Sequence, residues 1–315
     1  MNSKLRYLFI IFLIIIVSIF IINSTNKNIK KNNKRIIIDE KNSNNYVKKK
    51  KKEKDDEVGK DKTLSEKIEE IIDQECGNLE GDWQVAVDSL KGDFDISIYK
   101  SSNSQIESLP SASTIKIFLA LEAYREVEEG ILDEKNVEND IYLMLKDSNN
   151  ESANRLIDLI GNYDMEASSQ KINDTIKKIT GENKTGLYRK MLHDGKENMA
   201  NAKDLNMALR DIYFGKFVNK YHSNKMMEAM AENNTTSKFK LLGNLPKDAK
   251  GYSKSGEIPN KGVENDVAII SIGGKVFAIS FLSQYPYPVN HGQGPQFTCM
   301  QNLGQRISEA FLEYE

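Results

Sequence analysis

Histidine and cysteine are scarce in this chain of 315 residues, which has three of the first and two of the second. The histidines, His193, His222 and His291, are scattered, and no two of them have the spacing of a metal site. We interpret them as surface or core residues. The sequence therefore predicts no metal site and no other cofactor.

The two cysteines, Cys76 and Cys299, leave two possibilities open. They are either two unpaired, buried thiols or one disulfide, which an oxidising compartment would permit. Cys76 is near the end of the first predicted helix and Cys299 is near the start of the last. The two would meet if these helices ran antiparallel on one face of the fold.

Positive charge is concentrated at the N-terminal end of the chain. Residues 1–62 hold 16 Lys and Arg against 7 Asp and Glu, whereas residues 63–315 hold 28 against 39. Proteins that bind nucleic acid present a basic face to its phosphates. The acidic remainder of the chain therefore argues against nucleic acid as the main partner.

An apolar run near the N-terminus extends from Tyr7 to Ile22 and is interrupted only by Ser18. It is shorter than the ~20 residues of a usual spanning helix, and neither a small-x-small cleavage site nor a cysteine for lipid attachment follows it. We expect residues 1–23 to form an uncleaved membrane anchor that leaves the protein extracytoplasmic, with a cleaved signal as the alternative. Basic residues after the run favour the opposite orientation under the positive-inside tendency.

Residues 24–62 are rich in Lys, Asn and Asp and include the run Lys48–Lys52. This composition is typical of a disordered segment. We interpret the segment as a solvated stalk, with attraction to anionic lipid or wall polymer as the alternative.

The remainder, residues 63–315, has the pattern of one α/β (α+β) domain. Thr63 and Glu66 form a capping box before an amphipathic helix. Two alternating segments then predict a hairpin, a mostly helical block follows at about 113–246, and three short strands and a helix end the chain. The strands must pair across the helical block, which predicts an antiparallel five-stranded sheet flanked by helices, with an inserted helical subdomain. We expect a monomer.

Three short motifs lie on these predicted elements: Ser113-x-x-Lys116 at a helix start, Ser148-x-Asn150 at another, and Lys254-Ser255-Gly256 in a strand. Each alone is weak evidence, because either serine could simply cap a helix and Lys116 could extend to the surface. In this order and on these elements, the three together are strong evidence of a nucleophilic serine site.

Lys116 lies at the head of a helix that is apolar almost all round. Residues three apart share one face of a helix, so the Lys116 amine can reach the Ser113 hydroxyl. A buried amine beside a second cation, Lys254, has a lowered pKa. The neutral amine can then take the serine proton, which makes Ser113 a nucleophile.

These motifs resemble those of the serine β-lactamase and penicillin-binding protein superfamily. The chain is most similar to the class A β-lactamase catalytic domain, over nearly all of residues 63–315, and the stretches SNNESANRLIDLIG and VENDVAII support the resemblance. It implies a β-lactamase/transpeptidase-like fold in which Ser113 is the nucleophile and Lys116 its base. Ser148 would pass a proton to the leaving nitrogen.

The same resemblance implies a substrate-binding role for the remaining motif residues. Asn150 would donate to the side-chain amide of the substrate, and Lys254 and Ser255 would hold its carboxylate. Gly256 completes the strand motif, and the backbone N–H groups of Ser113 and Glu257 would form the oxyanion hole.

The chain departs from the family at the loop that carries the deacylating glutamate. The stretch TGLYRKMLHDG matches the frame of this loop, but Met191 stands at the glutamate position, and a thioether cannot accept a proton. Asp194 and Glu197 lie downstream at the wrong spacing. We expect acylation through Lys116 to survive and hydrolysis of the acyl-enzyme to be slow.

Further departures concern the substrate. Glu257 replaces a residue that is usually small, and Glu264 falls where many members place an arginine. Two carboxylates near an anionic substrate should weaken its binding. Asn149 in place of aspartate and Ser255 in place of threonine should have mild effects.

Three functions follow as hypotheses. The first is a serine hydrolase that opens a β-lactam or related amide through a Ser113 acyl-enzyme. The second is a D,D-peptidase or penicillin-binding protein that acts on D-Ala-type peptides of peptidoglycan. The third is a membrane-tethered binding or sensor domain that has lost turnover.

Overall fold

The structure is a computed structural model that describes residues 62–314, apart from 234, 235 and 291. The anchor predicted at residues 1–23 and all of the predicted stalk except Lys62 lie outside the described residues, as does His291. None of the helices in the described part of the chain combines the length and the apolar character needed to cross a membrane.

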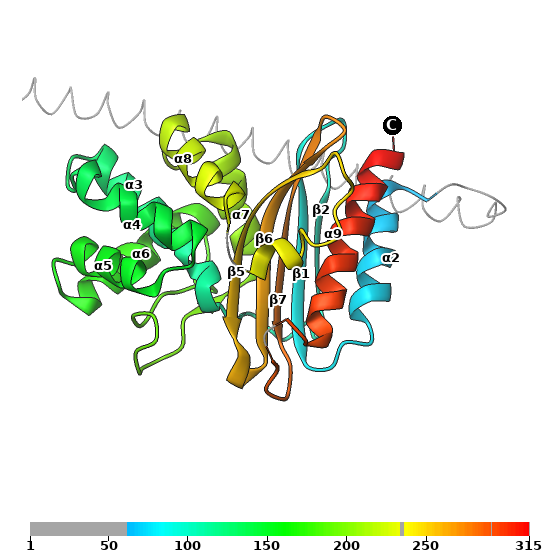
Figure 1. The fold of residues 1–315 in the computed structure, drawn as a ribbon, viewed down its shortest axis with the longest axis horizontal. Coiled ribbons are helices and arrows are strands. Elements are labelled where there is room, and N and C mark those ends of the chain that lie inside the picture. Colours follow the sequence, from blue (N-terminus) through cyan, green and yellow to red (C-terminus); the bar gives the residue numbers. More distant parts are fainter. Residues whose placement is uncertain (1–61, 234–235, 291, 315) are drawn as a thin grey trace, which may run out of the picture. The chain divides into compact units, whose positions relative to one another are not determined.

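Five strands form an antiparallel sheet, as predicted, and their order is β2-β1-β7-β6-β5 (Figure 1). Their bounds are β1 Asp82–Lys91, β2 Ser97–Ser101, β5 Lys250–Ile258, β6 Val263–Ile272 and β7 Lys275–Gln284. Strands from the two ends of the domain pair with each other, with Val85 of β1 opposite Phe281 of β7. Both β6 and β7 are buried along almost their whole length, because helices cover both faces of the sheet.

One face of the sheet is covered by α2 (Leu64–Cys76) and α9 (Pro295–Glu313), the first and last helices described (Figure 1). The predicted capping box starts α2: Glu66 N donates to Thr63 Oγ1 over 3.3 Å, and Thr63 N donates to Glu66 Oε2 over 2.8 Å. The apolar face of α2 packs with α9 and the sheet in one buried cluster. This layer contains none of the three motifs.

The opposite face carries the helical subdomain: α3 (Lys116–Glu128), α4 (Glu134–Lys146), α5 (Asn150–Ile160), α6 (Met165–Thr180), α7 (Ala202–Phe214) and α8 (Lys220–Ala231) (Figure 1). Of these, α3 is buried on nearly every side, as its apolar sequence predicts. A short strand pair, β3 (Leu109–Pro110) with β4 (Met199–Ala200), joins distant parts of this region. Two-residue strands have no periodicity, so the sequence did not predict them.

The two cysteines meet between α2 and α9. Their Sγ atoms are 3.2 Å apart, and both are buried, free thiols. Lys67 pairs with Glu313 at the other ends of the same helices, so α2 and α9 run antiparallel. The arrangement on which the disulfide alternative depends is therefore present, with both sulfurs reduced.

We expect a mild oxidant to join these thiols. On incubation with oxidised glutathione, thiol–disulfide exchange should form the Cys76–Cys299 bond and release two molecules of reduced glutathione. Closing so long a loop should raise the free energy of unfolding by about 2–4 kcal/mol. Thiol titration of the unfolded chain should then detect no free thiol, with Cys76→Ser as the control that cannot cross-link. Two titratable thiols after oxidation would contradict the prediction.

Candidate active site

Ser113 lies in a 3-10 turn, Ala112–Ile115, directly before α3. The backbone before it is unusual, because Ala112 has a φ of 46°, in the left-handed region that residues with a Cβ rarely adopt. Ser148, in the second motif, has a φ of 55°. Such conformations cost energy and concentrate at functional sites, where the surrounding structure holds them in place.

The Lys116 amine connects the first two motifs. Its side chain is fully buried, and Nζ donates to the Ser148 carbonyl oxygen and to Asn150 Oδ1, each over 2.7 Å. The Ser148 hydroxyl lies 3.3 Å from the same nitrogen. The amine therefore points away from solvent, which excludes the alternative in which Lys116 extends to the surface. Ser148 and Asn150, rather than the Ser113 hydroxyl, are its hydrogen-bond acceptors here.

Lys254 brings the strand motif to the same point. Its Nζ donates to Ser148 Oγ over 2.9 Å and to the Ser255 carbonyl oxygen over 2.7 Å. Two lysine amines therefore converge on one serine hydroxyl. The structure thus places residues from all three motifs together, although more than 100 positions separate Ser148 from Lys254.

The electrostatic environment of these amines follows from their burial. Burial lowers the pKa of Lys116 well below its usual value, and the neighbouring charge of Lys254 lowers it further, as the sequence predicted. Burial also lowers the pKa of Lys254 to about 7, against the opposing effect of Asp266. Both amines can therefore lose a proton far more readily than a lysine in water.

Gly256 allows strand β5 to lie against the Ser113 turn. A Cβ at this position would come within 2.8 Å of both Ser113 N and the Ser111 carbonyl oxygen. Any larger residue would have to push the strand away from the turn. Asn265 on β6 strengthens the same junction, because its Nδ2 donates to the carbonyl oxygens of Pro110 and Ser111.

The interpretation of Ser113 and Ser148 as helix caps is wrong. The residue that caps α5 is Asn149, whose side chain accepts a hydrogen bond from Ser152 N over 2.9 Å. The residue before α3 is Ile115, which makes no side-chain cap. Asn149 in place of the family's aspartate therefore keeps a capping function.

Lys240 is a residue of the site that sequence reasoning missed. It is fully buried, and its Nζ lies 2.7 Å from Glu264 Oε2 and 3.0 Å from Glu257 Oε1. The two glutamates are directly opposite each other on β5 and β6. The sequence predicts that Glu257 and Glu264 repel an anionic substrate, on the assumption that no cation lies beside them. Lys240 offsets the negative charge of both carboxylates. The feature of the sequence that could have revealed Lys240 is its position as a single lysine in the apolar stretch FKLL, which lies outside the periodic segments.

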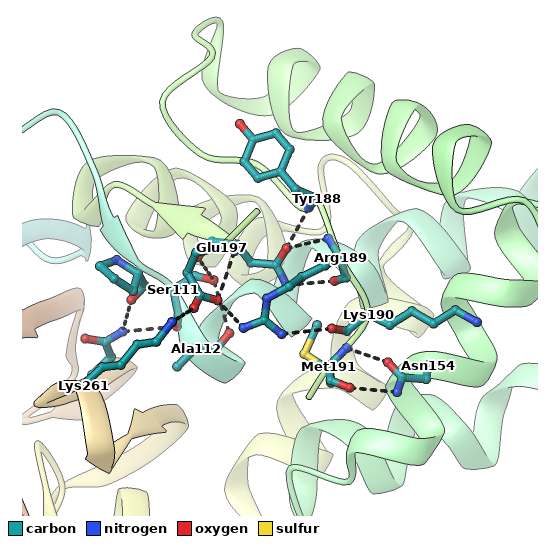
Figure 2. A network of polar contacts seen from close by, with 12 residues as sticks. Ser111, Ala112, Asn154, Tyr188, Arg189, Lys190, Met191, Glu197 and Lys261 are labelled. Atoms are coloured by element: carbon teal, nitrogen blue, oxygen red, sulfur yellow. Dashed lines mark hydrogen bonds and ion pairs between the residues drawn. The ribbon is translucent and has the colours of Figure 1, made fainter. Parts of the chain in front are cut away.

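The loop around Met191 has the frame that the sequence predicts. Asn154 Nδ2 donates to the Met191 carbonyl oxygen over 3.1 Å, and Met191 N donates to Asn154 Oδ1 over 2.7 Å (Figure 2). Met191 itself is buried in the main apolar cluster. The Asn154 side chain on α5 thus holds the loop at Met191 through both the N–H and the carbonyl group of that residue.

Neither downstream acid is available as a simple replacement for the absent glutamate. Glu197 pairs with Arg189 and with Lys261, the latter over 2.8 Å (Figure 2). Burial alone would raise the pKa of Glu197, but Lys261 and Arg189 outweigh it and hold this pKa below its usual range. Asp194 is exposed to solvent. Across the described residues, no group of three or more His, Cys, Asp and Glu side chains could hold a metal ion.

Replacing Lys240 should destabilise the fold strongly. Lys240→Met would leave the fully buried Glu264 opposite the half-buried Glu257 without the cation between them, which should cost about 3–5 kcal/mol. The free energy of unfolding in urea measures this cost. Lys238→Met, two residues away and exposed, is the matched control and should change it little. Equal stability of the two variants would show that Lys240 does not offset the glutamates.

Comparisons with known proteins agree with this geometry. A family model described as "Beta-lactamase enzyme family" matches residues 134–311. No curated protein sequence matches the chain.

Solved structures share the fold. PBP-A is 18% identical, with a TM-score of 0.65 over 81% of this chain and 99% of its own. An acyl-enzyme complex of a PBP-A mutant with penicillin G is 17% identical and has the same TM-score, over 81% of this chain and 100% of its own. A beta-lactamase from Sphaerobacter thermophilus is 20% identical, with a TM-score of 0.60 over 78% of this chain and 96% of its own. The family match spans more than half of the sequence, and this chain therefore belongs to the beta-lactamase enzyme family.

Proposed function

We propose that this protein is a serine hydrolase that opens a β-lactam or related amide through an acyl-enzyme on Ser113 and releases the product slowly. The observation that carries the proposal is the convergence of two buried lysine amines, Lys116 and Lys254, on the Ser148 hydroxyl beside the Ser113 turn. A site that only bound a ligand would have little reason to bury two amines so close together, because each is costly to desolvate.

Acylation needs a base and an acid, and the site offers both. Lys116, neutral because of its lowered pKa, takes the proton from Ser113 as the serine oxygen bonds to the substrate carbonyl carbon. The amide C–N bond then breaks. The leaving nitrogen takes the hydroxyl proton of Ser148, which recovers one from the Lys116 amine 3.3 Å away.

The strand motif Lys254-Ser255-Gly256 and its neighbours stabilise the negative charge of the substrate and of the transition state. The backbone N–H groups of Ser113 and Glu257 donate to the developing oxyanion, and removing one such donor typically costs about 100- to 1000-fold. Gly256 is what permits β5 to come this close to the turn. Lys254 and Ser255 bind the substrate carboxylate, and the hydrogen bond from Lys116 to Asn150 Oδ1 leaves the Asn150 amide N–H groups to donate to the substrate.

Deacylation lacks its usual base. Met191 cannot activate water, and Glu197 is engaged by two cations, Arg189 within the loop and Lys261 in the turn between β5 and β6. The acyl-enzyme should therefore persist. A persistent acyl-enzyme is also compatible with the second hypothesis, a penicillin-binding protein that acts on peptidoglycan. The fold that the chain shares with PBP-A supports this second hypothesis.

The remaining parts of the proposal concern the cell. Residues 1–23 would anchor the catalytic domain to the membrane through the stalk at 24–62, and the active site would face outward, where cell-wall peptides and β-lactams are found. A membrane-tethered sensor without turnover is the third hypothesis. Hydrolysis of any substrate at more than one turnover per enzyme would exclude it.

Intact mass spectrometry of the chain mixed with benzylpenicillin tests the proposed acyl-enzyme. We expect an adduct of one penicillin that persists for minutes or longer, and none on Ser113→Ala. Met191→Glu should shorten the adduct lifetime by about 100-fold, the usual contribution of a general base. Met207→Glu is the matched control, because it also adds a carboxylate at a methionine of the same apolar cluster but on α7, and it should leave the lifetime unchanged.

Absence of any adduct on the wild-type chain, with no penicillin consumed, would reject β-lactam acylation. An adduct that forms equally on Ser113→Ala would reject the nucleophile. Rapid penicillin turnover by the wild type would keep the hydrolase but reject slow deacylation, and would mean that another group activates water.

The pKa of Lys254 predicts an unusual pH dependence. As pH rises through about 7, Lys254 loses its proton and with it the attraction to the substrate carboxylate. The second-order rate constant for acylation by benzylpenicillin should fall about tenfold or more above this pH, since a hydrogen bond to a charged group is lost. The methyl ester of benzylpenicillin has no carboxylate, so its rate should not fall. Parallel profiles for acid and ester would contradict the assignment.

A further inference from the structure

A pocket of about 400 Å³ lies at the end of the sheet, and none of the residues that line it belongs to the three motifs of the acylation site. It is formed by the turn between β5 and β6, the start of β1, the end of β7, and the tyrosine- and proline-rich segment 285–288 that follows β7. Residues 285–288 lie outside the regular helices and strands, and nothing in the proposed chemistry uses them.

The pocket is held in a fixed shape by its own backbone. Tyr285 N donates to the Gly262 carbonyl oxygen over 2.8 Å, and Val289 N donates to the Pro259 carbonyl oxygen over 2.9 Å. Gly262 has a φ of 67°, and a Cβ there would lie 2.2 Å from the Tyr285 carbonyl oxygen. The segment can therefore approach the turn only because position 262 is glycine. A preformed pocket loses little entropy when it binds a ligand.

The pocket is close to the candidate active site. Gly256 touches the Ser113 turn, and Asn260, which lines the pocket, is four residues further along the chain. Four residues span at most about 14 Å. Lys261, also in the lining, pairs with Glu197 of the Met191 loop (Figure 2). One extended substrate could therefore occupy both sites.

The lining combines an exposed aromatic ring with neutral and acidic hydrogen-bonding groups. Tyr287 is 62% exposed, and its ring packs edge-to-face on Tyr285, with centroids 5.8 Å apart. Asp82, Asn260 and Gln284 line the same pocket as the two rings. The lysine of the lining is already paired, so the pocket suits a neutral ligand with one apolar face and a rim of hydroxyl groups. A sugar ring has this character, and tyrosine provides a rigid amphipathic surface for it.

We propose that this pocket binds a sugar ring of a cell-wall glycan, so that the substrate acylating Ser113 is a peptide still attached to its glycan. This inference rests on the proposed function in its peptidoglycan form. A proline-rich peptide would also stack on the tyrosines, but it offers few hydroxyl groups to Asp82, Asn260 and Gln284.

Saturation-transfer NMR on the full chain tests the proposal, with the soluble tetramer of N-acetylglucosamine as the probe. We expect transfer to the sugar C–H protons of the wild type, and at least tenfold weaker binding by Tyr287→Asn. Tyr163→Asn is the matched control, because Tyr163 is 76% exposed on the helical subdomain and should not affect binding. Its φ of 67° suits asparagine, so this control should fold.

Acylation by benzylpenicillin is measured on the same samples, which separates the two proposals. Acylation without sugar binding would overturn the glycan pocket and leave the proposed function intact. Sugar binding without acylation would support the pocket and count against the proposed function. Equal binding by Tyr287→Asn and wild type, or binding of a proline-rich decapeptide in place of the sugar, would also overturn the glycan assignment.

Discussion

The buried amine of Lys116 is the constraint on which the rest of the site depends. A primary amine without hydrogen-bond partners is too costly to bury, so it must find acceptors within the protein. Those acceptors are the Ser148 carbonyl oxygen and Asn150 Oδ1 at the start of α5. The need of the Lys116 amine for acceptors thus sets the distance between α3 and α5. Ser148, which provides one of these acceptors, has a left-handed backbone conformation.

A second set of buried charges surrounds the strand motif. Lys240 lies between Glu257 and Glu264, and Asp266 on β6 acts on Lys254. Buried charges of one sign would destabilise this region, whereas alternating charges offset one another. Burial, only partly opposed by Asp266, leaves Lys254 with a pKa of about 7, so its positive charge depends on pH in the range where most enzymes work. The charge of the cleft is therefore a property of the whole cluster rather than of any single lysine.

Much of the fold could be predicted because its signals are local. The alternating hairpin strands, the apolar β6 and β7, and the apolar α3 each have a periodicity that short windows reveal. The three motifs were found by their order along the chain. Lys240 and the strand pair β3–β4 could not be found in this way, and the contact of Cys76 with Cys299 could be stated only on the condition that the first and last helices run antiparallel. Each depends on partners distant in sequence, and none lies in a pattern long enough to predict its neighbour.

Residue identity alone determines which chemistry is open to this protein. Ser113 can be a nucleophile, Lys116 a base, and Met191 neither, because these properties belong to the side chains themselves. The packing of the domain decides which groups meet: Ser148 Oγ between two amines, Lys240 between two glutamates, and Gly256 against the Ser113 turn. Those contacts set the pKa values of the amines, because desolvation and neighbouring charge exist only once distant segments of the chain are buried together.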